Sequence, residues 1–340
     1  MAEDQTEFHR KTFVLDTFRA VQRLALLSLS LLILLIVAGA VVRVTGSGLG
    51  CPDWPTCWGQ LIPPTNLEQV DFEKLDVERF QRSAERFGRD PNEVTVENLK
   101  KDFDPMHVWI EFVNRLLALP TLLAVFLLMV VALRCKKATP IVKKLAVGSL
   151  VVTIANALFG IVVVASGLHS GVVTVHMALA FLLLFFLVYI VWAGGEKKPQ
   201  ITGASRRAVM VLLIVVMVEW FMGSQIREMT DVLQRERGTA SRPDWIGEIR
   251  DSWWFLAHRS FSWSILVAAL YVGMKVKWQG FVPRLVLLVV GILMVMGVVL
   301  SYAGIHAVTQ VLHVGLAGVL VSSVFYWYLA APKEEGGQGG

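Results

Sequence analysis

Two pairs of histidines in this chain share the same spacing and matching apolar surroundings. His169 and His176 form the first pair, and His306 and His313 form the second. Seven residues make almost two turns of an α-helix, so both members of a pair lie on one helix face. An imidazole within membrane-helix sequence is a candidate for function, and its duplication predicts two equivalent sites for something that binds histidine. Haem iron is the leading candidate.

The deeper histidine of each pair is the better iron ligand. His176 and His313 lie about two turns inside their apolar segments, whereas His169 and His306 lie at the outer ends, where an imidazole is tolerated without a function. His258, in another apolar segment, offers a facing ligand in the second half. The sequence therefore predicts a haem iron held by His258 and His313.

The first half lacks the matching histidine. Aligning Arg115 with Arg259 places Asn114 where the second half has its facing ligand. An iron held by His176 would therefore have an open or replaceable position, unless His107, seven residues before Asn114, substitutes as the ligand. This asymmetry is typical of a substrate site paired with an electron-transfer site.

Glu111 carries two interpretations. It lies four residues before Arg115, so one interpretation is a structural ion pair at the membrane edge. The other is a catalytic carboxylate beside a haem, which handles protons or stabilises positive charge on a reacting carbon. We favour the catalytic interpretation.

Arginines occupy equivalent positions in the two halves. Arg43 and Arg227 end their apolar segments at the outer surface, where they could bind haem propionates or extend toward the interface. Arg115 and Arg259 carry the same two interpretations. Glu219, inside an apolar segment, has no assigned role and could pair with one of these arginines.

Two cysteines bracket a short outer segment. Cys51 and Cys57 face the oxidising side of the membrane, so they predict a disulfide or a redox pair. Two thiols without a third ligand are too few for a typical zinc site. Cys135 lies on the reducing side and is expected to have no role.

These residues depend on membrane helices for their positions. The chain of 340 residues is 55% hydrophobic, with eight apolar segments about 20 residues long, enough to cross a bilayer. We therefore predict an all-α membrane protein. The predicted spans are Val21–Arg43, His107–Leu133, Ile141–Ser166, Gly171–Trp192, Arg207–Arg227, Trp253–Lys275, Val282–Tyr302 and His306–Leu329.

Basic residues fix the expected orientation. They concentrate before the first span and in the short connections after the second, fourth and sixth spans, so both termini are predicted to be cytoplasmic. The net charge of +5 then reflects topology, and no nucleic-acid partner is expected. Acidic residues near the N-terminus argue against a secretory signal or a transit peptide, which favours a bacterial inner membrane.

The spacing of the motifs predicts two parallel four-helix bundle repeats. Four spans return the chain to its starting side, so the halves can repeat about an axis along the membrane normal. The outer segment around 72–87 has apolar residues at helical spacing, which predicts a short amphipathic helix. The predicted parts are a tail (1–20), a first half (21–193) with a large outer loop (44–106), a linker (194–206), a second half (207–330) and a disordered tail (331–340).

Several of these segments resemble the haem A synthase family. The segment Gly39–Gly59 is the most specific motif, and five others match in order: Glu111–Arg115, Ser224–Glu228, His258-Arg259 and the two terminal histidine segments. The resemblance implies an enzyme that oxidises a methyl group of haem O to the formyl group of haem A, the cofactor of terminal oxidases.

The resemblance also implies roles for individual residues. Its haem b ligands fall on His258 and His313, and its substrate haem lies near His176. The essential glutamate of the family falls on Glu111, and its loop cysteines fall on Cys51 and Cys57. The chain departs from the family at Asn114, where many members have histidine.

This interpretation implies haem b as the cofactor, haem O as the substrate and O2 as a candidate oxidant. The expected partners are membrane lipid, a haem O synthase as substrate donor and an unknown electron donor, and the chain could form a homo-oligomer. The main alternative is a non-catalytic dihaem b-type cytochrome that transfers electrons from quinol. A haem transporter and a structural assembly factor are further alternatives.

Overall fold

The computed structural model describes residues 2–193, 200–202, 204, 206–238, 242 and 244–332, with side chains from Arg19 onward except at 170 and 235. Helices dominate this part of the chain. Most of the predicted linker 194–206 and of the predicted disordered tail 331–340 lies outside the described residues.

Eight of the described helices are long and apolar enough to cross a membrane. They confirm the all-α membrane fold, and α7 continues well beyond the predicted end of its span. Their bounds are α1 (Ala2–Thr45), α4 (Pro105–Arg134), α5 (Pro140–Ala165), α6 (Ser170–Ala193), α7 (Arg206–Arg237), α9 (Trp253–Lys275), α10 (Phe281–Tyr302) and α11 (Ala307–Ala330).

Side-chain caps start several of these helices. Asp104 accepts a hydrogen bond from the Met106 N–H, and Thr139 accepts one from the Val142 N–H, each just before a proline at the first helical position. Ser252 caps α9 by accepting a hydrogen bond from the Phe255 N–H. Because the first helical N–H groups have no partner within the helix, these caps fix where each helix begins.

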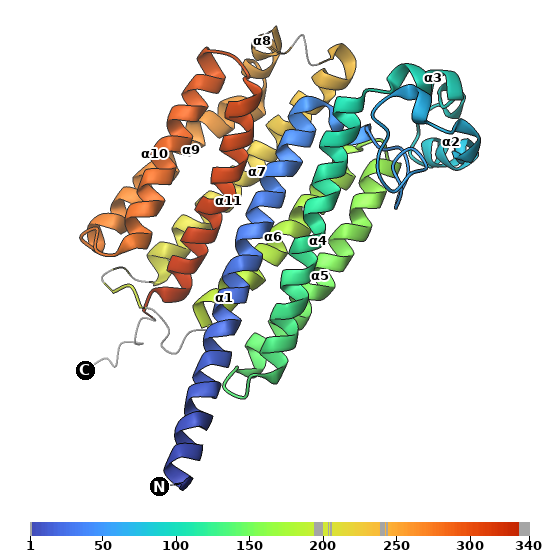
Figure 1. Ribbon diagram of the computed structural model, residues 1–340. Helices are drawn as coiled ribbons and strands as arrows, with labels where there is room; N and C mark the ends of the chain where they lie inside the picture. The colour runs from blue at the N-terminus through green and yellow to red at the C-terminus, as the bar shows by residue number, and fades with distance from the viewer. Residues whose placement is uncertain are drawn as a thin grey trace.

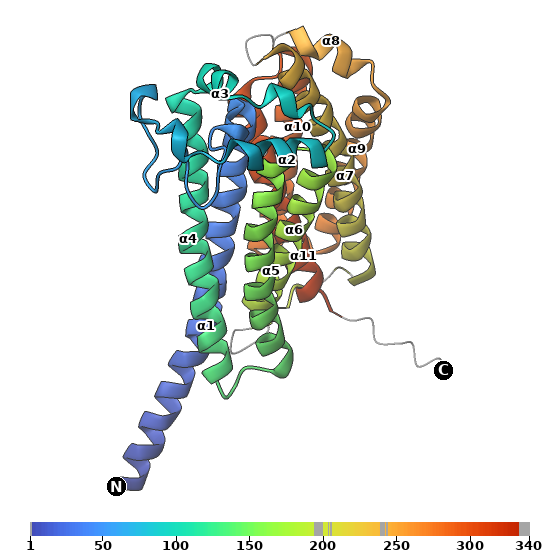
Figure 2. The same cartoon turned by 90° about the vertical axis from the view of Figure 1, so that its right-hand side faces the viewer.

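The helices have the same order of neighbours in both halves. In the first half α1 packs against α4 and α6, and in the second half α7 packs against α9 and α11. The halves meet where α11 contacts α1 and α6, and the two views of the bundle show them side by side (Figures 1 and 2). The predicted parallel repeat requires this order of neighbours, although the repeat itself stays a prediction.

The connecting helices gather at one end of the bundle. They are α2 (Val77–Arg86), α3 (Val96–Asp102) and α8 (Trp245–Arg250), and α1 begins at the opposite end (Figure 1). The predicted amphipathic segment 72–87 becomes a short 3₁₀ turn followed by α2. Ser83 and Arg89 both donate hydrogen bonds to the Ala165 carbonyl, so this segment caps the outer end of α5.

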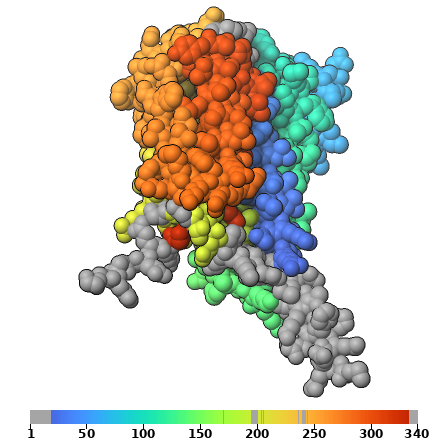
Figure 3. All heavy atoms as spheres, turned by 90° about the vertical axis from the view of Figure 1, so that its left-hand side faces the viewer, coloured from blue at the N-terminus to red at the C-terminus, as the bar shows by residue number. Residues whose placement is uncertain are grey.

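Apolar side chains cover the outside of the bundle as well as its core. Leu288, Val295 and Val298 of α10 are each more than half exposed. Figure 3 shows the face of the bundle that α9 and α10 (orange) form. A soluble protein rarely exposes so much apolar surface, whereas lipid chains cover it readily. The protein is therefore a multi-pass membrane protein.

Candidate functional site

The structure brings His258 of α9 and His313 of α11 together. Their ring centroids are 6.5 Å apart, with 66° between the ring planes. Both Nδ1 atoms are buried and make no hydrogen bond within the described part of the chain. Metal–imidazole bonds are about 2 Å long, so two imidazoles that hold one ion from opposite sides have centroids roughly 6 Å apart. The pair fits a haem iron.

A glycine lies next to one member of this pair. At Gly223 of α7 an added Cβ would lie 3.3 Å from His258 Cε1. The absence of a side chain at Gly223 therefore lets the imidazole lie close against α7. We call His258, His313 and Gly223 the rear site.

Glu219 lies beside the rear site rather than beside an arginine. Its Oε1 is 3.2 Å from His258 Nδ1, and the side chain is 11% exposed. The expectation that Glu219 pairs with an arginine is therefore wrong. Sequence spacing could not reveal this contact, because α7 and α9 are brought together only by the tertiary fold.

At the positions equivalent to His258 and His313, the first half has Asn114 and His176. His176 of α6 lies against α5, where a Cβ at Gly160 would be 3.6 Å from its Cε1. Asn114 of α4 and Asn156 of α5 each have a buried Oδ1 that makes no hydrogen bond to any described residue. We call His176, Gly160, Asn114 and Asn156 the front site.

Glu111 is buried just outward of Asn114 on α4. The residue is 3% exposed, and its Oε1 accepts a hydrogen bond of 2.5 Å from Arg115 Nη2. Its Oε2 accepts a hydrogen bond of 2.9 Å from the Cys51 N–H. The ion pair that the structural interpretation expected is present, and it lies inside the protein rather than at an exposed edge.

Arg115 fixes the outer loop onto α4. Besides its ion pair with Glu111, it donates hydrogen bonds to the carbonyls of Cys51, Asp53 and Thr56. In this structure the guanidinium therefore binds the loop. Its expected binding of a haem propionate stays a prediction.

The loop itself is closed by a disulfide between Cys51 and Cys57, as predicted, while Cys135 is a free, buried thiol. Next to the disulfide, a Cβ at Gly50 would lie 2.5 Å from the His107 carbonyl oxygen. Only glycine allows the backbone to come this close to α4. The disulfide and this close approach together bring the Cys51 N–H to Glu111.

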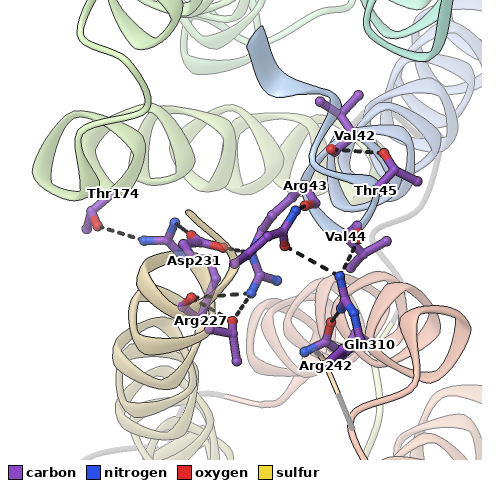
Figure 4. Close-up of polar contacts among 11 residues, drawn as sticks. Val42, Arg43, Val44, Thr45, Thr174, Arg227, Asp231, Arg242 and Gln310 are labelled. Atoms are coloured by element: carbon purple, nitrogen blue, oxygen red, sulfur yellow. Dashed lines mark hydrogen bonds and ion pairs between the residues drawn. The ribbon is translucent and has the colours of Figure 1, made fainter. Parts of the chain in front are cut away.

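Three arginines and one carboxylate form a cluster between the halves, which we call the outer arginine cluster: Arg43, Arg227, Arg242 and Asp231 (Figure 4). Asp231 Oδ1 is 2.5 Å from Arg43 Nε, and its Oδ2 is 2.9 Å from Arg227 Nη1. Arg227 also donates a hydrogen bond to Thr174 of α6. The cluster therefore ties α7 to both α1 and α6.

Arg242 extends the cluster toward α11. It donates hydrogen bonds to Gln310 and to the Val44 carbonyl (Figure 4). Burial lowers the pKa of this guanidinium, and the nearby charge of Arg43 lowers it further. The cluster holds more positive than negative charge, which suits anionic groups.

Comparison with known proteins places the chain in a family. The sequence profile of the COX15-CtaA family, described as cytochrome oxidase assembly protein, matches residues 22–325. The chain belongs to this family. It is also 26% identical over 192 residues to a heme A synthase from Shewanella oneidensis, and that alignment covers 56% of this chain. The chain spans about half the length of this curated relative, 49%. The two matches confirm the family resemblance drawn from the sequence motifs.

The remaining predicted residues are exposed or make other contacts. His107 is partly exposed, with its Nδ1 3.8 Å from Asp104 Oδ2. His169 and His306 are exposed at the start of α6 and α11. Arg259 is exposed, with its guanidinium 5.8 Å from the centroid of the Phe255 ring.

Sequence reasoning missed Asp231, Arg242 and Asn156. Asp231 had a usable signal, because it follows Arg227 by four residues and so lies on the same helix face. Arg242 and Asn156 had none, since their neighbours come from distant parts of the chain.

Proposed function

We propose that this protein is a haem A synthase, which oxidises a methyl group of haem O to a formyl group. The observation that carries the proposal is the asymmetry of the two sites: two imidazoles whose ring centroids are 6.5 Å apart at the rear, and one imidazole, His176, with Asn114 at the equivalent of His258 at the front. Membership of the cytochrome oxidase assembly protein family and the similarity to a named heme A synthase support it.

The rear site would hold haem b between His258 and His313. When bound, haem b supplies one-electron transfer, with a potential set by its axial ligands and their surroundings. The protein's part is to fix both imidazoles and exclude water. The burial of both Nδ1 atoms and the close seat of His258 against Gly223 serve this purpose.

The front site would hold haem O through His176 alone. Asn114 is a poor iron ligand, so the opposite side stays accessible to O2 or to another exchangeable group. Glu111 lies just under one helical turn outward of Asn114, on neighbouring parts of the same face. Its hydrogen bonds from Arg115 and from the Cys51 N–H fix the carboxylate, which can stabilise positive charge at the reacting carbon and accept a proton.

The outer arginine cluster would neutralise haem propionates from both sites. Arginine forks bind carboxylates with paired hydrogen bonds, and this cluster has three guanidiniums for one aspartate. The orientation proposed from the basic residues places the cluster on the outer face of a bacterial inner membrane, with both termini cytoplasmic. The proposed partners are lipid, a haem O synthase, an electron donor and a second copy of the chain.

Haem extraction from the purified protein tests the proposal. The protein is co-expressed with a haem O producer, and bound haems are identified by chromatography and mass spectrometry. Wild type should contain haem b together with haem O or haem A. Glu111→Ala should accumulate haem O or a hydroxylated intermediate, whereas Glu248→Ala, at an exposed ion pair, should behave as wild type.

Two outcomes would contradict the proposal. Unchanged haem A yield in Glu111→Ala removes the role of the carboxylate. A wild-type protein that binds haem b but never yields haem A favours the electron-transferring cytochrome instead.

A further inference from the structure

Glu219 is a buried carboxylate in the middle of a membrane-spanning helix. Its Oε2 is buried and makes no hydrogen bond among the described residues, and its Oε1 lies 3.2 Å from His258 Nδ1. A carboxylate at this depth is unfavourable unless it interacts with a partner, so its presence favours a function.

The contact involves the ring nitrogen of His258 that an iron would leave available. The two atoms are within hydrogen-bonding distance, although they make no hydrogen bond in this structure. Histidines that bind metals usually donate their other N–H to a carboxylate or carbonyl, which fixes the ring and makes it a stronger ligand.

The fold does not require a carboxylate at this place. Aligning α1 with α7 through Arg43 and Arg227 also aligns Gly39 with Gly223, and it places Leu35 opposite Glu219. The equivalent position in the first half is therefore apolar, in a helix with the same kinds of neighbours. Of the two rear imidazoles, His258 has a carboxylate within 3.2 Å of its Nδ1, whereas the Nδ1 of His313 has no hydrogen-bond partner among the described residues.

From this contact we infer that Glu219 is a positioning residue for haem b. It accepts a hydrogen bond from His258 Nδ1–H, orients the ring toward the iron and lowers the reduction potential of haem b. The inference rests on the proposed function, because it requires haem b between His258 and His313. The front site has Leu35 at the matching position, so Glu219 would lower the reduction potential only of the haem at the rear site.

Potentiometric titration of purified, haem-loaded protein tests the inference. The absorbance of haem b is followed in wild type, Glu219→Gln, Glu219→Leu and Glu219→Asp. The Gln and Leu variants should have a higher midpoint potential, and Asp should restore part of the wild-type value. Glu248→Gln, which removes an exposed negative charge on the outer side, should leave the potential unchanged.

Electron paramagnetic resonance of oxidised haem b gives a second measurement. If Glu219 orients the His258 ring, the g-values of the Gln variant should shift, whereas a residue that only packs would leave them unchanged. Weaker retention of haem b in Glu219→Gln, with normal haem O binding at the front, also supports the inference because front binding shows that the variant folds.

Failure of the inference and failure of the proposed function have different signatures. Unchanged midpoint potential and g-values in Glu219→Gln, with haem A still formed, overturn the inference alone. A wild-type protein that binds no haem b overturns both.

Discussion

The front and rear sites use equivalent positions of similar helices for different side chains. A buried carboxylate belongs to each half, but the two make different contacts. In the first half, Glu111 of α4 accepts a hydrogen bond from the outer loop at Cys51. In the second half, Glu219 of α7 lies next to the His258 imidazole. The equivalent pairs are Glu111 and Phe255, Asn114 and His258, and Leu35 and Glu219. In the proposed function, these differences separate the site that reacts from the site that holds a cofactor.

The outer ends of the two sites differ as well. At the front, Arg115 is held by Glu111 and three loop carbonyls. At the rear, Arg259 is exposed and lies over Phe255. An arginine over an aromatic ring contributes about 0.5–1 kcal/mol when exposed. The front site therefore has the more strongly fixed outer wall.

The largest expected effect comes from removing an imidazole at the rear. His313→Ala should abolish the six-coordinate spectrum of haem b, because one of its two proposed ligands is lost. His176→Ala should leave that spectrum unchanged and remove haem O instead. Absorption spectra follow the coordination of haem b, and haem extraction gives the amount of haem O. If His176→Ala lost the haem b spectrum and His313→Ala lost haem O, the proposed roles of the two sites would have to be exchanged.

A histidine at position 114 should make the front site resemble the rear. Asn114→His would supply a second ligand, and an added interaction of about 1.4 kcal/mol slows haem release about tenfold. We expect more haem O or haem A to remain bound and haem A to be delivered more slowly. Asn114→Gln is the matched control, since glutamine adds length without an imidazole. Equal release rates in all three proteins would show that position 114 does not distinguish the sites.

The smallest expected effect concerns the carboxylate between the halves. Asp231→Asn removes the partner of Arg43 and Arg227, so it should lower the free energy of unfolding by roughly 1–3 kcal/mol. Thermal unfolding in detergent measures this change. Glu248→Gln breaks an exposed ion pair and should change it by less than about 1 kcal/mol. Equal unfolding midpoints for the two variants would contradict a stabilising role for Asp231.

The sequence predicts the elements of the fold well. Hydropathy identifies all eight spans, because each must be long and apolar to cross a bilayer. The rear imidazole pair also follows from sequence, since His258 and His313 lie in different apolar segments at similar depth. The Cys51–Cys57 bridge follows from proximity in the chain and from the predicted topology.

The contacts between distant residues could not be predicted in the same way. Glu219 beside His258, and Arg43 with Arg227 on one aspartate, depend on which helix faces meet. The hydrogen bond from Cys51 to Glu111 depends on a loop path that only the close approach at Gly50 allows. Periodicity assigns a residue to a helix face, but it does not say which helix covers that face.

The bridge through Asp231 means that neither half is a stand-alone module. A truncated protein that ended after α6 would leave Arg43 without its acid and Thr174 without its arginine. It would also uncover the surface of α1 where Val37 lies against Gly315 of α11, so closely that a Cβ there would be 2.7 Å from Val37 Cγ2. An engineered protein in which one half is replaced by that of a relative must therefore keep these contacts between the halves.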